Sequence, residues 1–208
     1  NVKLTIHSSD NFIKRDSEKG NNSKKNVLKK ILKKILSKNK FLAILYLKKT
    51  MHNNSKRVVE NYLRNNKESD LVFFQELITC YYYLKSRKNT KTKVVLVLHT
   101  NGDTFKMLRI YYPKLKKSNY YKYLLNIEKY VLNNIDQLGF VAKTSLENFK
   151  KLNPVFDVSK LFYVLNGQGN IDLKSNYKGM RKYSFCYVGS ITKRKGQELL
   201  IKTFEKLP

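Results

Sequence analysis

The chain has 208 residues, of which 41% are hydrophobic, and its 43 lysines and arginines against 15 acidic residues give a formal net charge of +28. This hydrophobic content excludes a chain that is disordered by composition, and the length suits one α/β domain and part of a second. The longest apolar run, Phe41 to Leu47, is far shorter than the roughly 20 residues that span a bilayer, and no secretory pattern opens the sequence, so we expect a cytoplasmic protein.

A strand, a loop and a basic helix are predicted for the first part of the chain. Residues Val2 to Ile6 alternate as a strand does, and the polar stretch from Asp10 to Lys25 indicates a loop. From Val27 onward apolar residues recur at three- and four-residue steps, and the other side of this helix carries Lys29, Lys30, Lys33 and Lys34. A lysine-faced helix with an apolar stripe is typical of peripheral binding to an anionic membrane at its inner face. An ordinary surface helix that buries its stripe on the sheet explains the same pattern.

The middle of the chain alternates helices with strands. A helical stretch around Ser55 to Asn65 precedes a short apolar strand, Asp70 to Phe74, which Glu76 and a helix near Tyr82 follow. Lys93 to His99 is the strongest predicted strand, because its apolar run does not alternate with polar residues. Such a run is typical of a strand that is buried on both faces.

The same alternation continues to the end of the chain. We predict a helix over Tyr120 to Asn134, a strand over Gly139 to Ala142, a helix over Ser145 to Leu152 and a strand over Leu161 to Leu165. A further strand, Phe185 to Gly189, and a helix from Gly196 to Leu207 then begin a second domain.

Strands that alternate with helices predict an α/β fold, with a mainly parallel, Rossmann-like sheet that has helices on both faces. We therefore assign residues 1–173 to a first domain, 174–182 to a linker and 183–208 to the first strand and helix of a second Rossmann-like domain. Two cysteines, Cys80 and Cys186, match no metal or redox spacing, so we expect both to be buried free thiols.

Polar residues at the strand ends are the first candidates for a site, because ligands of parallel sheets bind at the carboxyl ends of strands. His99 ends the strongest strand and can donate to a sugar hydroxyl or a phosphate oxygen. Asn101, Gly102 and Asp103 follow it, and Glu76 follows the preceding strand. The alternative for the polar residues of this loop is simple capping of the next helix beside a solvent-exposed histidine.

A second candidate is the basic turn from Gly189 to Gly196, which includes Ser190, Arg194 and Lys195. Free amides, the positive end of a helix dipole and the Lys195 ammonium would converge there, which suits a diphosphate. A Walker-type phosphate loop is excluded, because Arg194 stands where its second glycine would fall. A basic turn without function is the alternative.

Asn166 and Gly167 after the strand at 161–165 indicate a turn with positive φ. The glycines that follow invite a dinucleotide interpretation. No helix is predicted after them, and Asp172 occupies the third glycine position, so we reject the Rossmann fingerprint.

Taken in order, these pieces resemble the retaining family 4 glycosyltransferases of the GT-B fold. The resemblance covers residues 70–208 well and 1–69 only loosely. The matching segments are Asp70 to Phe74; His99 with Asn101 to Asp103; Glu128 followed by Val131 to Asp136 and Gly139 to Ala142; Tyr163 to Gly167 with Ile171 and Asp172; and Phe185 to Gly189 through Lys195, Gly196, Leu199, Leu200 and Phe204.

The resemblance implies two Rossmann-like domains that face each other across a cleft, the first binding the acceptor and the second a nucleotide-sugar. It implies sugar transfer with retention and without a metal ion or other cofactor, to a glycan or a lipid-linked acceptor, in the synthesis of cell-surface polysaccharide or glycolipid. By the same resemblance Lys195 would neutralise the leaving diphosphate, helped by the amides after Gly189. His99 would touch the donor sugar, and Asn166 and Gly167 would shape the hinge.

The sequence departs from the family pattern at several places. Ser190 stands where the family usually has an arginine, a charge that Arg194 could supply, and Ala142 replaces a serine. The family's glycine-rich loop is expected before Asn1, and its paired glutamates beyond Pro208. We therefore expect residues 1–208 alone to be inactive, and measurable sugar transfer by them would contradict this.

Two other functions stay open. One is a catalytically inactive partner subunit of a glycosyltransferase pair, which the serine at position 190 would suit. The other is a basic protein that binds a membrane or nucleic acid without catalysis. Nucleic acid is the less favoured partner, because the sequence has no zinc spacing, no RNA-binding aromatic strand and no clear recognition helix.

Overall fold

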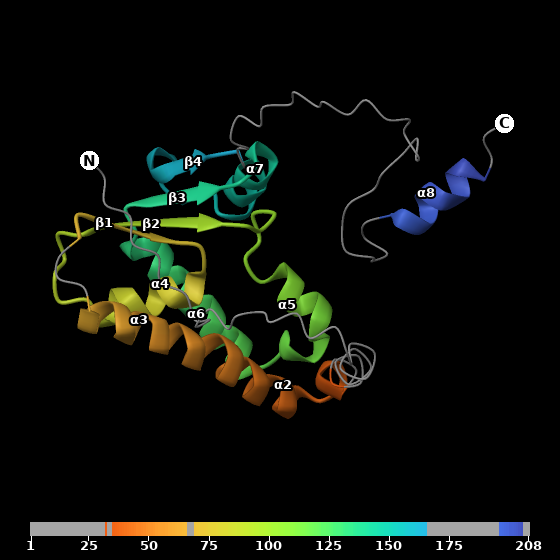
Figure 1. Cartoon of the computed structure of the whole chain (residues 1–208), viewed down its shortest axis with the longest axis horizontal. Coiled ribbons are helices and arrows are strands. Elements are labelled where there is room, and N and C mark those ends of the chain that lie inside the picture. The colour runs from red at the N-terminus through yellow and green to blue at the C-terminus, as the bar shows by residue number, and fades with distance from the viewer. Residues whose placement is uncertain (1–31, 33–34, 66–68, 166–195, 206–208) are drawn as a thin grey trace, which may run out of the picture. The chain divides into compact units, whose positions relative to one another are not determined.

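A computed structural model describes residues 32, 35–65, 69–165 and 196–205, which belong to two units that divide after Gly167. The described residues of the first unit contain one four-stranded sheet, and all its strand pairs are parallel (Figure 1). The strands lie in the order in which they occur in the chain: β1 (Leu71–Phe74), β2 (Lys93–Leu98), β3 (Gln137–Phe140) and β4 (Leu161–Tyr163). The predicted α/β class with a parallel sheet is confirmed. The strand predicted at 139–142 in fact begins two residues earlier and ends at Phe140.

Helices connect the strands and extend before them. Their bounds are α2 (Lys40–Leu47), the π-helix η1 (Lys48–Asn53), α3 (Asn54–Asn65), α4 (Leu77–Ser86), α5 (Lys106–Tyr111), the 3-10 helix η2 (Pro113–Leu115), α6 (Asn119–Asn134), α7 (Lys143–Leu152) and the 3-10 helix η3 (Val158–Lys160). The sequence did not predict α2, whose residues are almost all apolar and show no helical periodicity. Its start is fixed by Asn39, whose side-chain oxygen accepts hydrogen bonds from the amides of Phe41 and Leu42 at 3.0 and 3.1 Å.

The helices that pack on the sheet through aromatic contacts lie on one of its faces. Phe74 of β1 contacts Tyr83 of α4 with ring centroids 5.2 Å apart, and Phe140 of β3 contacts Phe149 of α7 at the same distance. The register places both phenylalanines on the same face, because they pair with Leu96 and Leu98 of β2, which are two residues apart.

Right-handed crossovers between parallel strands in this order put all connecting helices on one side. On the opposite face, Leu71 and Phe73 are 52% and 50% exposed. On this same face Val95 and Val97 of β2 are buried, and the helices that the described part of the first unit shows against the sheet lie on the other face.

The core forms around β2, whose residues Val94 to Leu98 are all buried. This confirms the expectation that the strand is buried on both faces. Cys80 of α4 is a buried free thiol, as predicted, and burial raises its pKa to about 12. The largest fully buried side chains of this core are Leu96, Leu115, Leu124, Ile127, Ile135, Leu138, Phe140 and Phe149.

In the second unit the structure describes α8 (Gln197–Phe204), which follows Gly196 in a left-handed conformation with φ 73°. This helix was predicted from Gly196 onward. Residues 32 and 35–38 are helical, in agreement with the helix expected from Val27. The predicted strands at 2–6 and 185–189, the loop at 10–25, the linker at 174–182 and Cys186 lie outside the described residues.

A buried histidine joins the π-helix η1 to two helices of the core. His52 is 6% exposed, and its Nδ1 and Nε2 lie 3.1 and 3.0 Å from the hydroxyl oxygens of Tyr82 on α4 and Tyr120 on α6. The ring also stacks on Tyr123. Burial, reinforced by the charge of Lys48, lowers the pKa of His52 below 6.5.

His52 predicts an acid-sensitive contribution to stability. Because its pKa is lower in the folded protein than the ordinary 6.5, the unfolded chain binds the proton more readily. The contribution of His52 to the free energy of unfolding is therefore complete above pH 6.5, and it is lost as the pH falls through the folded-state pKa. The substitution His52→Gln keeps hydrogen-bonding groups but does not titrate, so its stability should depend less on pH in this window. Denaturant titrations on both sides of pH 6.5 measure this, and parallel pH profiles for the two proteins would contradict it.

Candidate ligand site at the carboxyl edge of the sheet

Two polar segments meet at the carboxyl edge of the sheet. Glu76 comes two residues after β1 ends, and the loop from His99 to Asp103 comes directly after β2. Since β1 and β2 are parallel and Phe74 pairs with Leu96, both segments leave the sheet at the same edge. The structure thus brings five predicted site residues to one edge: Glu76, His99, Asn101, Gly102 and Asp103. Ligands of parallel sheets bind in this position.

Glu76 is exposed at the start of α4, and a chain of hydroxyl groups holds its carboxylate. The Thr79 hydroxyl oxygen lies 3.1 Å from Glu76 Oε2 and 3.0 Å from the hydroxyl oxygen of Ser55 on α3. A hydroxyl has one proton to give, so Thr79 can donate to Glu76 while it accepts from the buried Ser55. The carboxylate therefore keeps free lone pairs that face solvent.

His99 is exposed immediately after the five buried residues Val94 to Leu98. Its backbone therefore leaves a rigid strand, while its imidazole is accessible and can act as donor or acceptor. The next residue, Thr100, has a buried hydroxyl oxygen with no hydrogen-bond partner; it is the sole such side-chain atom among the described residues. An unsatisfied buried polar atom at a sheet edge fits a loop that binds a polar ligand.

The loop is fixed against α7 by two consecutive residues. Asn101 Oδ1 accepts a hydrogen bond from the Asn148 side-chain amide at 3.1 Å. Gly102 has φ +79°, and a Cβ there would lie 2.5 Å from the Phe149 nitrogen and 2.6 Å from the Ser145 carbonyl oxygen. Only glycine combines this backbone conformation with so close an approach to another backbone.

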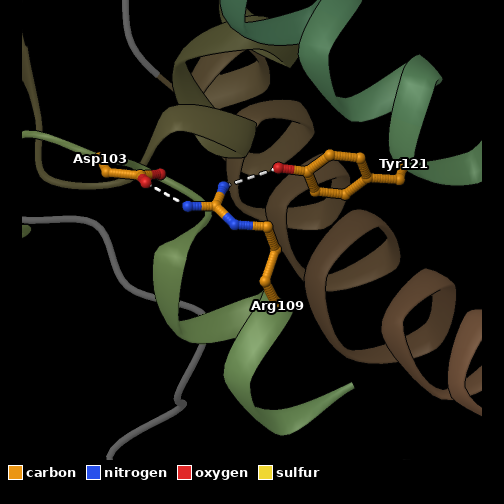
Figure 2. Close-up of polar contacts among 3 residues, drawn as sticks. All are labelled: Asp103, Arg109 and Tyr121. Carbon is orange, nitrogen blue, oxygen red and sulfur yellow. Dashed lines mark hydrogen bonds and ion pairs between the residues drawn. The ribbon is translucent and has the colours of Figure 1, made fainter. Parts of the chain in front are cut away.

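Asp103 is fixed by an arginine rather than by a helix terminus (Figure 2). Its carboxylate forms an ion pair with the guanidinium of Arg109, which also donates to the Tyr121 hydroxyl at 2.7 Å. These bonds, the one to Asp103 first, raise the pKa of Arg109. The alternative interpretation is therefore right in one part and wrong in the other: His99 is exposed, but the side chains of Asn101 and Asp103 do not cap the next helix, since α5 begins after Phe105 without a side-chain cap.

Glu128 of α6 adds a second carboxyl group beside Arg109. Burial is the main cause that raises its pKa, and the negative charge of Asp103 raises it further; a hydrogen bond from Thr104 and the charge of Arg109 oppose this shift. Thr104 and Asp103 are adjacent, so the end of the loop is held from both α5 and α6.

Sequence reasoning assigned no role to Arg109, Tyr121 or Glu128, although Glu128 belonged to the family pattern. One signal could have indicated Arg109: it is an arginine in a chain where lysine is far commoner, and a guanidinium makes two directed bonds at once. The partner on α6 could not be read from sequence spacing.

The remaining predicted site residues lie outside the described residues: Asn166, Gly167, Gly189, Ser190, Arg194 and Lys195 for the donor, and Lys29, Lys30, Lys33 and Lys34 for the membrane surface. Among the residues that the structure describes, no cluster of His, Cys, Asp or Glu could hold a metal ion. Nor does any helix in these described ranges have the length and apolar character needed to cross a bilayer.

Comparisons with protein-family models, with curated proteins and with solved structures find no match for this chain.

We expect the stability of the protein to be unusually sensitive to one methyl group added at Gly102. In Gly102→Ala the new carbon would meet two backbone atoms of α7 and would require a left-handed backbone, so we expect a loss of about 2–4 kcal/mol. The matched variant is Gly139→Ala on β3, where the new carbon meets the outer atoms of the Phe162 and Val97 side chains. The ring of Phe162 can move, whereas Val97 is buried, so we expect a smaller loss of about 1–2 kcal/mol. Chemical denaturation compares the two, and equal losses would show that Gly102 is not held tightly against α7.

The contacts of Arg109 with Asp103 and Tyr121 indicate that the loop from His99 to Asp103 depends on α6 for its stability. In Arg109→Gln the Asp103 carboxylate loses its charged partner, which should lower stability by about 1–2 kcal/mol and speed amide hydrogen exchange across residues 100–105. The control is Lys106→Gln, which removes one positive charge from an exposed position of the same helix. Unchanged exchange in Arg109→Gln relative to this control would rule out the coupling.

Proposed function

We propose that this chain is the acceptor-side part of a nucleotide-sugar-dependent, retaining glycosyltransferase. The proposal combines the order of motifs in the sequence with the geometry of the sheet edge. The observation that carries it is the position of His99: an accessible imidazole at the end of a fully buried parallel strand, on a loop that is fixed against α5, α6 and α7. Binding residues on a loop that a rigid scaffold positions are the usual arrangement of an active site.

Sugar hydroxyl groups suit the residues at this edge. The imidazole of His99 can donate to or accept from a hydroxyl, and the Glu76 carboxylate can accept from a second one. A glycosyl transfer breaks the bond between the anomeric carbon and the diphosphate, and forms a bond from that carbon to the acceptor oxygen. The acceptor proton goes to the departing phosphate oxygen. In this proposal His99 and Glu76 orient the reacting sugars, while the leaving diphosphate is stabilised by Lys195 and the amides after Gly189.

The test uses the complete gene product that contains this sequence. It is incubated with a panel of nucleotide-sugars and glycan or lipid-linked acceptors, and release of the nucleoside diphosphate is followed. We expect acceptor-dependent release with at least one donor. His99→Ala should reduce kcat on the order of a hundredfold, because it removes an oriented group at the reacting sugar. Glu76→Gln should raise KM for the acceptor.

Glu60→Gln is the matched control for Glu76→Gln, because Glu60 is an exposed glutamate within α3 rather than in a segment that follows a strand. It should leave both constants unchanged. Release from no nucleotide-sugar would contradict the proposal and favour an inactive relative. Full turnover by a folded His99→Ala variant would contradict the role that the proposal gives to His99.

A further inference from the structure

After Lys40, helix α2 carries apolar or aromatic side chains on every side, although several of them are exposed. Ala43 and Leu47 are buried, whereas Phe41 is 67% exposed and Leu45 is also exposed. Residues two apart lie on nearly opposite sides of a helix, so these two exposed side chains point away from the core. A helix that is hydrophobic all round belongs either in the core of a protein or in contact with lipid.

Helix α5, which packs against the 3-10 helix η2 as α2 does, also has exposed apolar side chains. Met107 and Ile110 of α5 are exposed, Ile110 by 59%. Both α2 and α5 pack against η2, and the two helices lie at the same end of the unit (Figure 1). The four side chains Phe41, Leu45, Met107 and Ile110, together with the lysines described next, are called the α2–α5 surface.

Lysines collect at the place where α2 meets η2. An open pocket of about 420 Å³ is lined by Lys40, Pro113, Lys114, Lys116 and Lys117. Neither of the two segments that build the α2–α5 surface, residues 35–59 and 104–127, contains an aspartate or a glutamate. The field at this pocket is therefore strongly positive, and it favours phosphate groups.

We propose that the α2–α5 surface binds an anionic phospholipid bilayer. The apolar side chains enter the boundary between headgroups and acyl chains, and the lysines of the pocket bind lipid phosphates. The occupant follows from charge complementarity: exposed aromatic and aliphatic side chains bordered by lysines, with no acidic residue in either segment, match an anionic bilayer interface. The proposal depends on α2, α5 and η2 alone and holds whether or not the chain belongs to a transferase.

Vesicle flotation tests the proposal on the full chain. Vesicles of phosphatidylcholine alone are compared with vesicles that also contain phosphatidylglycerol. We expect binding to the anionic vesicles that weakens with salt, and little binding to the neutral ones. Replacing Lys114, Lys116 and Lys117 by glutamine should weaken binding on the order of a hundredfold. Phe41→Ser combined with Ile110→Ser should weaken it at least about tenfold.

Each variant has a matched control. Lys88, Lys91 and Lys93, which lie at or before the amino end of β2, are replaced by glutamine to remove the same charge. Leu152→Ser with Val155→Ser removes exposed apolar groups at the end of α7. Both controls should bind like the wild-type chain.

Three outcomes would overturn the proposal. One is no binding of the wild-type chain to anionic vesicles. Another is an equal loss when Lys88, Lys91 and Lys93 are replaced, which would mean attraction by net charge alone. The third is a dimer in sedimentation that Phe41→Ser with Ile110→Ser dissociates, because the surface would then be an interface between two copies.

Discussion

The fully buried strand β2 is the constraint on which the rest of the first unit depends. Parallel pairing with β1 on one side and β3 on the other fixes where the strand ends, and so fixes where the polar loop from His99 to Asp103 begins. A strand with no exposed side from Val94 to Leu98 cannot slip in register without exposing its apolar residues or breaking its pairing. The backbone of His99, the first residue of the loop, is therefore held rigidly by the strand.

From that starting point, three independent contacts determine the path of the loop. Gly102 lies directly on the backbone of α7, Asn101 bonds to Asn148 of the same helix, and Asp103 pairs with Arg109, which is itself held by Tyr121. His99 makes none of these contacts. The residues after His99 are fixed, while its own accessible imidazole makes none of the contacts that fix them. Such a loop is suited to binding, because it loses little conformational entropy when a ligand binds.

The four strands could be predicted because each is a short apolar run bounded by polar residues, which is a local signal. The distribution of helices over the faces could not, because it depends on strand order and crossover hand; in the described part of the first unit the helices lie on one face. Helix α2 was missed since its apolar residues follow no helical period, and this same feature makes its surface unusual.

At the site, position at a strand end indicated His99, but the capping role assigned to Asp103 was wrong. Its partner Arg109 and the neighbouring Glu128 are brought to it by tertiary packing.

Hydrogen exchange of the complete gene product, measured with and without a nucleotide-sugar and its acceptor, is the most direct test of the central claim that the sheet edge binds the sugar. The account predicts slower exchange in peptides that contain residues 99–103 and 76, with no change in the peptide that contains residues 88–91 at the opposite end of β2. Protection that leaves residues 99–103 unchanged, in a protein that demonstrably binds the ligand, would contradict it.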